Sequence, residues 1–359
     1  MITSSQRTSA MPAAAAFVSV TLLLAGCSGS GTAATEDSAG GDEQPGVSLV
    51  PEAEGTVEYP LTLDTVHGTI EIAERPERVA VMGHSANHDA VAALGVTPVY
   101  AAADRDIDFG WTDPAWLDGI DTLDVQDGNA VNVEGVAAAE PDLIFLPNTA
   151  EMFEEEDLAR LAAIAPVLEA PDVISGDQVD WRDAPQLLGE ALDLRSRAED
   201  AIREADEAIE ATSEEHPEFD GRTITLAYDY GEEFGIDYYT VTDGTAEEIV
   251  TLLGFEPNPL AEQFVADAAV SEENQAQLDA DVLVMFYSDD ATREAREASE
   301  LFQQVPAVAD DRYVAVVGEE DERAEDGAIW ALRRGTSVLS IPWTLDALAD
   351  WAGEVDVED

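Results

Sequence analysis

The sequence predicts an α/β protein of two Rossmann-like lobes, each built on a parallel-rich sheet, with one long α-helix bridging them. Three observations support this fold class. Short apolar strands alternate with helical segments, as in parallel α/β sheets. A helical stripe of about 30 residues divides the chain, and the half that follows it repeats the first half in outline. We therefore place an N-terminal lobe at residues 56–180, the bridging helix at 181–215 and a C-terminal lobe at 216–359.

The N-terminal lobe is predicted to open with a β-hairpin. Val57–Asp64 and Thr69–Ile72 alternate in polarity around His67-Gly68, as the arms of a hairpin do. The helical segment His88–Leu94 is followed by Gly95, the residue type favoured just after a helix C-terminus. The buried strands of this lobe are short apolar runs: Arg78–Met82, a strand that begins at Pro98, and Asp142–Leu146.

One uninterrupted helix is expected to bridge the lobes. Between Ala184 and Ser213 the only glycine is Gly189, no proline follows Pro185, and apolar residues recur at helical spacing. About thirty residues at 1.5 Å each would make a rod of ~45 Å. A rod of this length favours a strut between two lobes over a helix packed on a single sheet.

The second half repeats the plan of the first. A strand is predicted at Arg222–Tyr228, and the helix Glu247–Leu253 is closed by Gly254. Asp281–Phe286 corresponds to the earlier strand Asp142–Leu146. Each of these two strands follows a short helix with a glutamate eight residues before the aspartate, Glu134 and Glu273. Ligands of such sheets bind beyond the carboxyl ends of the strands, so we expect a ligand cleft between the lobes.

The N-terminus has the pattern of an exported lipoprotein. Arg7 gives a positive start, and the apolar run Met11–Leu24 is too short to cross a ~30 Å hydrocarbon core. It therefore indicates a signal peptide, at residues 1–27. Leu24-Ala25-Gly26-Cys27 resembles the bacterial lipobox, which implies lipidation of Cys27 and anchoring to the outer face of the cytoplasmic membrane. Residues 28–55 are rich in glycine, serine, alanine and acidic residues, a composition that predicts a flexible acidic tether. The alternative is an ordinary signal peptide with an incidental cysteine.

The composition limits the partners. The chain has 78 acidic and 16 basic residues, every basic residue is arginine, and the formal net charge is −62. Nucleic acid is excluded as a partner because phosphate binding needs a basic face. A surface this acidic favours a soluble monomer and fits a saline or alkaline habitat. With a single cysteine in the chain, no intramolecular disulfide can form.

Several fragments, in order and spacing, resemble the periplasmic-binding-protein domain of iron-siderophore transporters over roughly residues 57 to 352. These fragments are Tyr59–Thr62, Gly68–Ile72, Arg75–Val79, Ala93–Val99, Glu140–Ile144, Ile164–Leu168, Leu301–Val308 and Arg312–Val316. The resemblance implies the class III fold of this family, in which a single helix joins two α/β lobes. It also implies capture of a ferric siderophore and delivery to the permease dimer of an ABC importer. The iron would arrive with the siderophore, so no intrinsic cofactor and no protein metal site are expected.

Two other ligand classes and one other role stay open. Haem and corrinoids bind to proteins of the same fold, and a lipid-anchored ligand sensor would have the same sequence features. Catalysis is not expected. The chain has no Gly-x-Ser-x-Gly elbow and no His-Glu-x-x-His motif.

The adjacent arginines Arg333 and Arg334, close after Trp330, are the first candidates for ligand binding. Guanidinium groups suit the carboxylate or catecholate oxygens of a siderophore. The alternative is that they pair with local acids such as Glu325 or Asp326.

Further candidates follow the predicted strands, where side chains reach the carboxyl edge of a sheet. Aromatic residues offer an apolar face, and tyrosine adds a hydroxyl donor; edge packing is the alternative for each. His84 and His88 could share a helix face, which alone is a weak indication of a metal site. The candidates are Tyr228, Tyr230, Tyr287, His84, Asn148 and, in a loop that also holds Trp116, Trp111.

The family resemblance also implies one exposed glutamate on each lobe for docking to arginines of the permease. In the C-terminal lobe Glu273 resembles that position. In the N-terminal lobe the choice is Glu155 or Glu156, with Glu134 as an alternative. Exposed charge pairs of this kind steer docking more than they hold it.

Overall fold

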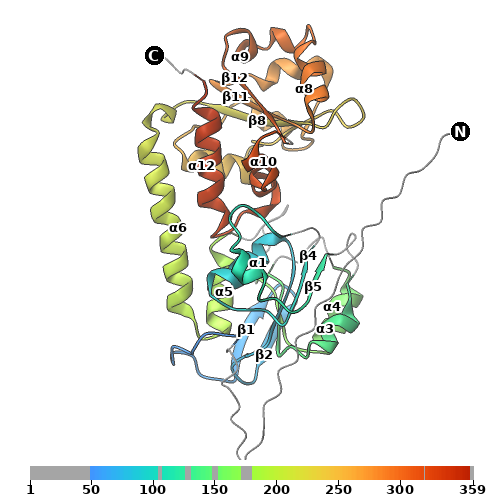
Figure 1. Ribbon diagram of the computed structural model, residues 1–359, viewed down its shortest axis with the longest axis vertical. Coiled ribbons are helices and arrows are strands. Elements are labelled where there is room, and N and C mark those ends of the chain that lie inside the picture. Colours follow the sequence, from blue (N-terminus) through green and yellow to red (C-terminus); the bar gives the residue numbers. More distant parts are fainter. Residues whose placement is uncertain are drawn as a thin grey trace, which may run out of the picture. The chain divides into compact units, whose positions relative to one another are not determined.

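The computed structural model describes residues 49–103, 107–125, 131–147, 153–170, 180–318 and 320–355, apart from the side chains of Ser85, Arg334 and Gly335. The described chain forms two α/β lobes, as predicted (Figure 1). Cys27 and the signal peptide lie outside the described residues. In the part of the chain that is described, no helix is both long and apolar enough to cross a membrane.

The N-terminal lobe holds a parallel sheet preceded by the predicted hairpin. The hairpin pairs β1 (Leu61–Thr65) with β2 (Gly68–Ile72) in antiparallel register. Among the described residues the sheet has the order β5-β4-β3-β6-β7, with every pair parallel. Its strands are β3 (Val79–Gly83), β4 (Tyr100–Ala103), β5 (Leu123–Val125), β6 (Leu143–Phe145) and β7 (Val167–Leu168). The helices are α1 (Ser85–Ala93), α2 (Pro114–Leu117), α3 (Val133–Ala138), α4 (Glu155–Ala162) and α5 (Asp183–Ala191).

The C-terminal lobe has the same plan with one reversed strand. The described order is β10-β9-β8-β11-β12, and β9 runs antiparallel to both of its neighbours. The strands are β8 (Ile224–Asp229), β9 (Ile236–Tyr238), β10 (Ala269–Val270), β11 (Val282–Tyr287) and β12 (Tyr313–Val317). The main helices are α7 (Thr245–Leu252), α8 (Asp290–Glu297), α9 (Pro306–Ala309), α10 (Glu322–Glu325), α11 (Ala328–Trp330) and α12 (Ser340–Ala352).

Matching aspartates close the two central strand pairs at their amino ends. The carboxylate of Asp142, just before β6, accepts hydrogen bonds from the backbone N–H groups of Glu77 and Arg78 at 2.8 Å each. The carboxylate of Asp281, just before β11, accepts from the backbone N–H of Thr223 at 2.8 Å and from its hydroxyl at 3.0 Å. The repeat expected between the halves is therefore present at the level of individual hydrogen bonds.

The expectation of a single uninterrupted rod from Ala184 to Ser213 was wrong. The segment forms two helices, α5 and α6 (Arg195–Glu215), with a break around Asp193, whose φ is +53°. The carboxylate of Asp193 accepts hydrogen bonds from the backbone N–H groups of Gly55, Thr56 and Val57, at 2.7, 2.9 and 3.1 Å. Three backbone donors from residues 55–57 therefore stabilise the turn of the chain at Asp193.

Helix α6 nevertheless bridges the lobes (Figure 1). Near its start, Ala198 is buried in the core of the N-terminal lobe. Further along, Ala205 and Ile209 are buried in the core of the C-terminal lobe beneath α12. At 1.5 Å per residue, the helix passes from one core to the other within roughly 10–16 Å. One stiff element therefore ties both cores together.

Candidate functional site

A cluster of aromatic rings and one guanidinium lies at the carboxyl end of β8. We call Tyr228, Tyr230, Tyr239 and Arg333 the tyrosine–arginine cluster. The Nη1 of Arg333 donates a hydrogen bond to the Tyr230 hydroxyl at 2.9 Å, and the Tyr230 and Tyr239 hydroxyls lie 2.6 Å apart. The rings of Tyr228 and Tyr230 are stacked with centroids 4.2 Å apart, and the Arg333 guanidinium carbon lies 6.0 Å from the ring centroids of both Tyr230 and Tyr239.

Strand alternation brings these side chains together. Tyr228 is opposite Asp237 in the β8–β9 pairing, and Tyr239 follows β9. Tyr228 and Tyr239 both pack on the sheet face that forms the larger core with α7 and α12. Burial raises the pKa of Tyr239 and of Tyr228, so their hydroxyls stay protonated donors at neutral pH.

Arg333 reaches the cluster from a π-helical turn, η5 (Ala331–Gly335), between α11 and α12. Such turns insert one extra residue into a helix and are often found at functional sites. Arg333 contacts Tyr230 and Tyr239 and interacts electrostatically with the half-buried carboxylate of Asp237. The Arg334 side chain and all of Asn148 lie outside the described residues.

The N-terminal lobe contributes aromatic side chains next to this turn. The ring of His84, directly after β3, lies 6.3 Å from the ring of Trp330. Trp111 and Trp330 both pack against a small cluster of Ala103, Ile107 and Phe109. His84 and Trp330 thus lie together, and Trp330 is three residues before Arg333 of the tyrosine–arginine cluster. Trp111 shares the small cluster with Trp330 but stacks on Phe109 at 4.6 Å between centroids.

Tyr287 does not lie with the other tyrosines. It is opposite Asp229 in the β8–β11 pairing, whereas Tyr228 is opposite Phe286. Neighbouring residues of a strand point to opposite faces, so Tyr287 is fully buried in the other core, with its hydroxyl 2.7 Å from that of Tyr313. The expectation that Tyr287 reaches the ligand region is not supported by this placement.

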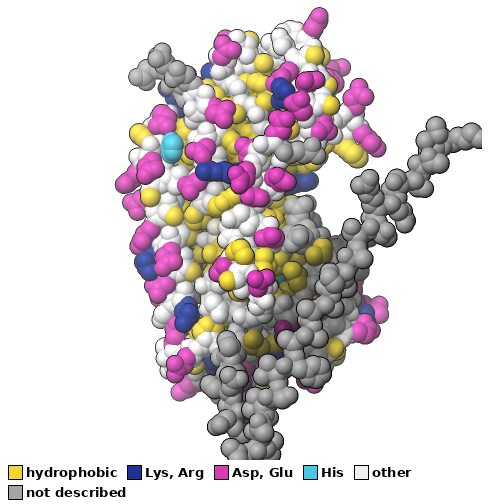
Figure 2. All heavy atoms as spheres, viewed as in Figure 1, with side chains coloured by type: hydrophobic (Ala, Val, Ile, Leu, Met, Phe, Trp, Pro, Cys, Tyr) yellow, Lys and Arg dark blue, Asp and Glu magenta, His cyan; other side chains and the backbone are white. Residues whose placement is uncertain are grey.

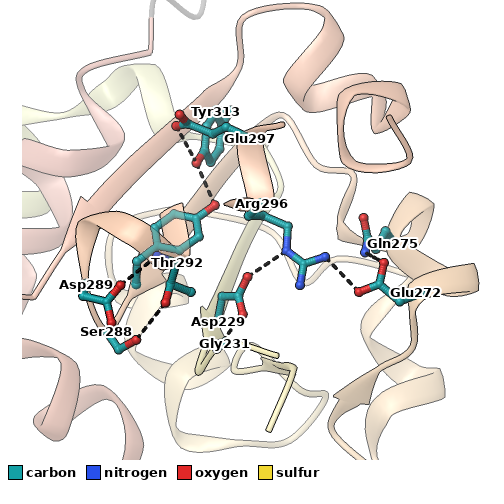
Figure 3. Close-up of polar contacts among 11 residues, drawn as sticks. Asp229, Gly231, Glu272, Gln275, Ser288, Asp289, Thr292, Arg296, Glu297 and Tyr313 are labelled. Carbon is teal, nitrogen blue, oxygen red and sulfur yellow. Dashed lines mark hydrogen bonds and ion pairs between the residues drawn. The ribbon is translucent and has the colours of Figure 1, made fainter. Parts of the chain in front are cut away.

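A separate pocket lies on the α8 side of β8, and Figure 3 shows the polar contacts of residues around it, among them Asp229, Glu272 and Arg296. The guanidinium of Arg296 joins the buried carboxylate of Asp229 at 2.7 Å to Glu272 at 3.1 Å. The cavity beside it, about 560 Å³ in volume, is also bordered by Glu232 and Asp289. Arg296 therefore fixes α8 against β8, and it is the one cation among carboxylates on the charged part of the cavity lining.

The glutamates predicted to dock a permease are all exposed. Glu273 lies in the first turn of the 3₁₀ segment Glu272–Leu278 that precedes β11. Glu155 and Glu156 begin α4, after β6. Glu134 begins α3, before β6, and its side chain is 85% exposed. By its place in the repeat, Glu134 is the counterpart of Glu273, and Glu155 and Glu156 are not.

The face of the molecule drawn in Figure 2 shows no large basic patch among the described residues. Figure 2 shows acidic side chains spread over both lobes, with few arginines between them. Within the described ranges, no group of three or more histidine, cysteine, aspartate or glutamate side chains is arranged to hold a metal ion.

Sequence reasoning missed Tyr239 and Asp89. The sequence does hold a signal for Tyr239: it ends a second short segment that can pair with the strand carrying Tyr228, so both tyrosines can lie on the same face of the sheet. Asp89, on α1, accepts hydrogen bonds from Trp111 and from Ser337, which is 248 residues away. No local pattern in the sequence indicates such a partner.

Comparison with known proteins agrees with this architecture. The periplasmic binding protein family matches residues 80–316, more than half of the chain. A comparison with curated proteins gives no significant match.

Solved structures share the fold at low sequence identity. One is a periplasmic solute binding protein of Mycobacterium smegmatis, with 24% identity, a TM-score of 0.62 and coverage of 82% of this chain and 98% of that one. Another is PiaA of Streptococcus pneumoniae in complex with ferrichrome, with 22% identity, a TM-score of 0.64 and coverage of 82% and 97%. A third is SirA of Staphylococcus aureus complexed with staphyloferrin B, with 20% identity, a TM-score of 0.61 and coverage of 83% and 100%. With the family match and the two bridged lobes, the chain belongs to the periplasmic binding protein family.

Proposed function

We propose that this protein is an extracytoplasmic solute-binding lipoprotein that captures a ferric siderophore and delivers it to the permease dimer of an ABC importer. It acts as a binding protein and not as an enzyme. The observation that carries the proposal is the tyrosine–arginine cluster at the carboxyl end of β8, whose Arg333 follows Trp330, the neighbour of His84, by three residues.

The chemistry of the cluster suits such a ligand. Hydroxamate, catecholate and carboxylate siderophores present oxygen atoms with negative charge, and a guanidinium gives them short, charge-assisted hydrogen bonds. The tyrosine hydroxyls add neutral donors, and the aromatic rings give apolar walls. Proteins of the same fold have been solved with ferrichrome and with staphyloferrin B, which supports this ligand class.

The test is a fluorescence titration of the chain from Ser28 onward. Ferric hydroxamate, catecholate and carboxylate siderophores, haem and cobalamin are titrated separately, and tryptophan quenching is recorded. We expect saturable quenching at micromolar or lower concentration by one siderophore class. Saturation by haem or cobalamin alone would replace the ligand class, and no response from any ligand would refute the proposal.

Arg333→Ala should weaken binding of that ligand by about 10- to 100-fold, the range of one or two hydrogen bonds to a charged group. Arg203→Ala is the matched control, since Arg203 is an exposed arginine of α6 paired with Asp200 and Glu207. Equal affinities of the two variants would remove Arg333 from the binding site.

Docking to the permease would use Glu134 and Glu273. The repeat supports this pair, because each glutamate begins the short helix before a central strand. Glu272, beside Glu273, borders the acidic cavity of the C-terminal lobe, which adds negative charge for a guanidinium of the permease. Charge reversal by Glu134→Arg or Glu273→Arg should reduce transport in proteoliposomes, whereas Glu210→Arg on α6 should not. A larger loss of transport in Glu155→Arg or Glu156→Arg than in Glu134→Arg would place the docking residue of the N-terminal lobe on α4.

The lipid anchor would be Cys27. Cys27→Ser should release the protein from membranes and abolish incorporation of labelled fatty acid. Retention of the label in this variant would refute lipidation at that residue.

A further inference from the structure

The two lobes touch at a second place besides α6. The loop 107–112 of the N-terminal lobe packs on the segment 326–343 of the C-terminal lobe, and we call this the loop contact. The backbone N–H of Gly110 donates to the carbonyl of Asp326 at 2.9 Å. The ring of Trp111 lies edge-on to that of Trp343, with centroids 5.4 Å apart.

Glycines make this approach possible. A Cβ on Gly110 would overlap the indole of Trp343, with the Cε2 atom 2.9 Å away. A Cβ on Gly327, whose φ is +116°, would lie 2.5 Å from the ring of Phe109. The backbones therefore meet more closely than any side chain would allow.

Asp89, on α1, forms hydrogen bonds with both segments of the loop contact. Its Oδ2 accepts a hydrogen bond from the indole N–H of Trp111 at 3.0 Å and from the Ser337 hydroxyl of the other lobe at 2.6 Å. Only 4% of Asp89 is exposed. The Ser337 oxygen also accepts from the backbone N–H groups of Leu339 and Ser340, which fixes it at the start of α12.

The hydrogen bonds that Asp89 accepts from described side chains come from two neutral donors, and the burial of the carboxylate disfavours its negative charge when the lobes are in contact. A buried charge without a counter-charge is costly, whereas the neutral acid can keep the same hydrogen bonds. Separation of the loop contact would let water reach Asp89 and would remove that cost.

We propose that Asp89 is a proton-controlled latch of the ligand site: its neutral form holds the loop contact closed, and its ionisation loosens the contact and speeds ligand exchange. The part that concerns ligand exchange rests on the proposed function. Asp89 can affect the candidate site because the segment that it holds, 326–343, carries Trp330 and Arg333 of that site. In addition, Asp89 lies on α1, which begins directly after His84.

The electrostatics support the geometry. Burial raises the pKa of Asp89 to about 7, although the hydrogen bonds from Ser337 and Trp111 oppose the rise. The closed contact therefore binds the proton more tightly than an open one, and it should weaken as pH rises from about 4 to about 7 and change little above. The other titratable or charged groups at the start of α1, in the loop 107–112 and in the segment 326–343 are His84, His88, Asp108, Asp326, Arg333 and Arg334.

Hydrogen–deuterium exchange of the ligand-free, lipidated mature protein in detergent tests the latch directly. The amide of Gly110 reports the contact, since its acceptor lies in the other lobe. After correction for intrinsic exchange, we expect its protection to fall by up to about tenfold per pH unit between pH 5 and 7. Asp89→Asn, which imitates the neutral acid, should keep protection high and independent of pH.

Asp321→Asn is the matched control. Asp321 also accepts a hydrogen bond from an indole, that of Trp351 at 3.0 Å, but both residues belong to the C-terminal lobe. This variant should keep the wild-type pH dependence. Ser337→Ala should lower the protection of Gly110 at every pH, and it stands in as the test if Asp89→Asn does not fold.

A wild-type protection that does not change with pH would overturn the latch. So would a wild-type pH dependence in Asp89→Asn, which would show that a group other than Asp89 controls the contact. Because no ligand is present, these outcomes do not depend on the identity of the solute. The release rate of the bound solute, measured separately, should rise with pH in wild type and not in Asp89→Asn.

Discussion

Gly110→Ala should separate the lobes at the loop contact while leaving each lobe folded. A methyl group on Gly110 would meet the indole of Trp343 at 2.9 Å from Cε2 and closer still at Cζ2, and it would lie 3.2 Å from the Cβ of Asp326. Real Cβ contacts are not found below about 3.0 Å, so the ring or the loop must move by roughly 1 Å. Trp343 cannot move freely, because it packs on the core beneath α12 and against Trp111.

The expected cost is that of overpacking, about 1–3 kcal/mol in the free energy of unfolding. If the loop moves instead of the ring, the hydrogen bond from Gly110 to Asp326 is lost, which costs about 1 kcal/mol and falls in the same range. The measurement is urea denaturation followed by tryptophan fluorescence, together with hydrogen exchange of residues 107–112.

Gly318→Ala is the control for this prediction. Its Cβ would lie 3.6 Å from the carbonyl oxygen of Tyr287, an ordinary contact within one lobe. This variant should unfold within about 0.5 kcal/mol of wild type. The reasoning fails if Gly110→Ala has wild-type stability and wild-type exchange in its loop.

Two further predictions concern the fold. The carboxylate of Asp193 gathers donors from Gly55, Thr56 and Val57, and these hydrogen bonds hold its pKa below the usual range although burial acts against them. The stabilisation that the Asp193 carboxylate gives is therefore present above the ordinary carboxyl pKa and is lost as pH falls through the lower pKa of the folded state. Asp193→Asn should lower the free energy of unfolding by about 1–2 kcal/mol at pH 7. The difference from wild type should shrink when thermal unfolding is measured at acidic pH. Tyr287→Phe removes a buried hydroxyl and should cost about 1 kcal/mol in stability with no change in solute affinity, and a tenfold loss of affinity would return Tyr287 to the site.

The sequence was sufficient for the longer elements because their signals are local. The hairpin around His67-Gly68 and the helices closed by Gly95 and Gly254 were confirmed, and both glycines have the positive φ that the closing position requires. The short strands β5 and β7 were not predicted. They have only three and two residues, too few for a periodic pattern.

Features that depend on contacts between residues far apart in the chain could not be predicted from local sequence patterns. The break at Asp193 depends on donors from residues 55–57, which no helical periodicity reveals. Tyr287 was misplaced for a different reason. Its strand was predicted, but the position of a residue at a strand end does not say which face of the sheet its side chain occupies. Tyr287 is opposite Asp229, and it therefore lies on the other face from Tyr228.

The loop contact changes what the bridging helix can permit. With α6 alone, the lobes could twist or bend about a single stiff rod. With the loop contact closed as well, any opening must break the hydrogen bond between Gly110 and Asp326 and the one between Asp89 and Ser337. Neither lobe has to unfold for this to happen, because both hydrogen bonds run between the lobes and neither lies within the core of one lobe. We therefore expect small opening motions at the candidate site, set by the loop contact and limited by α6.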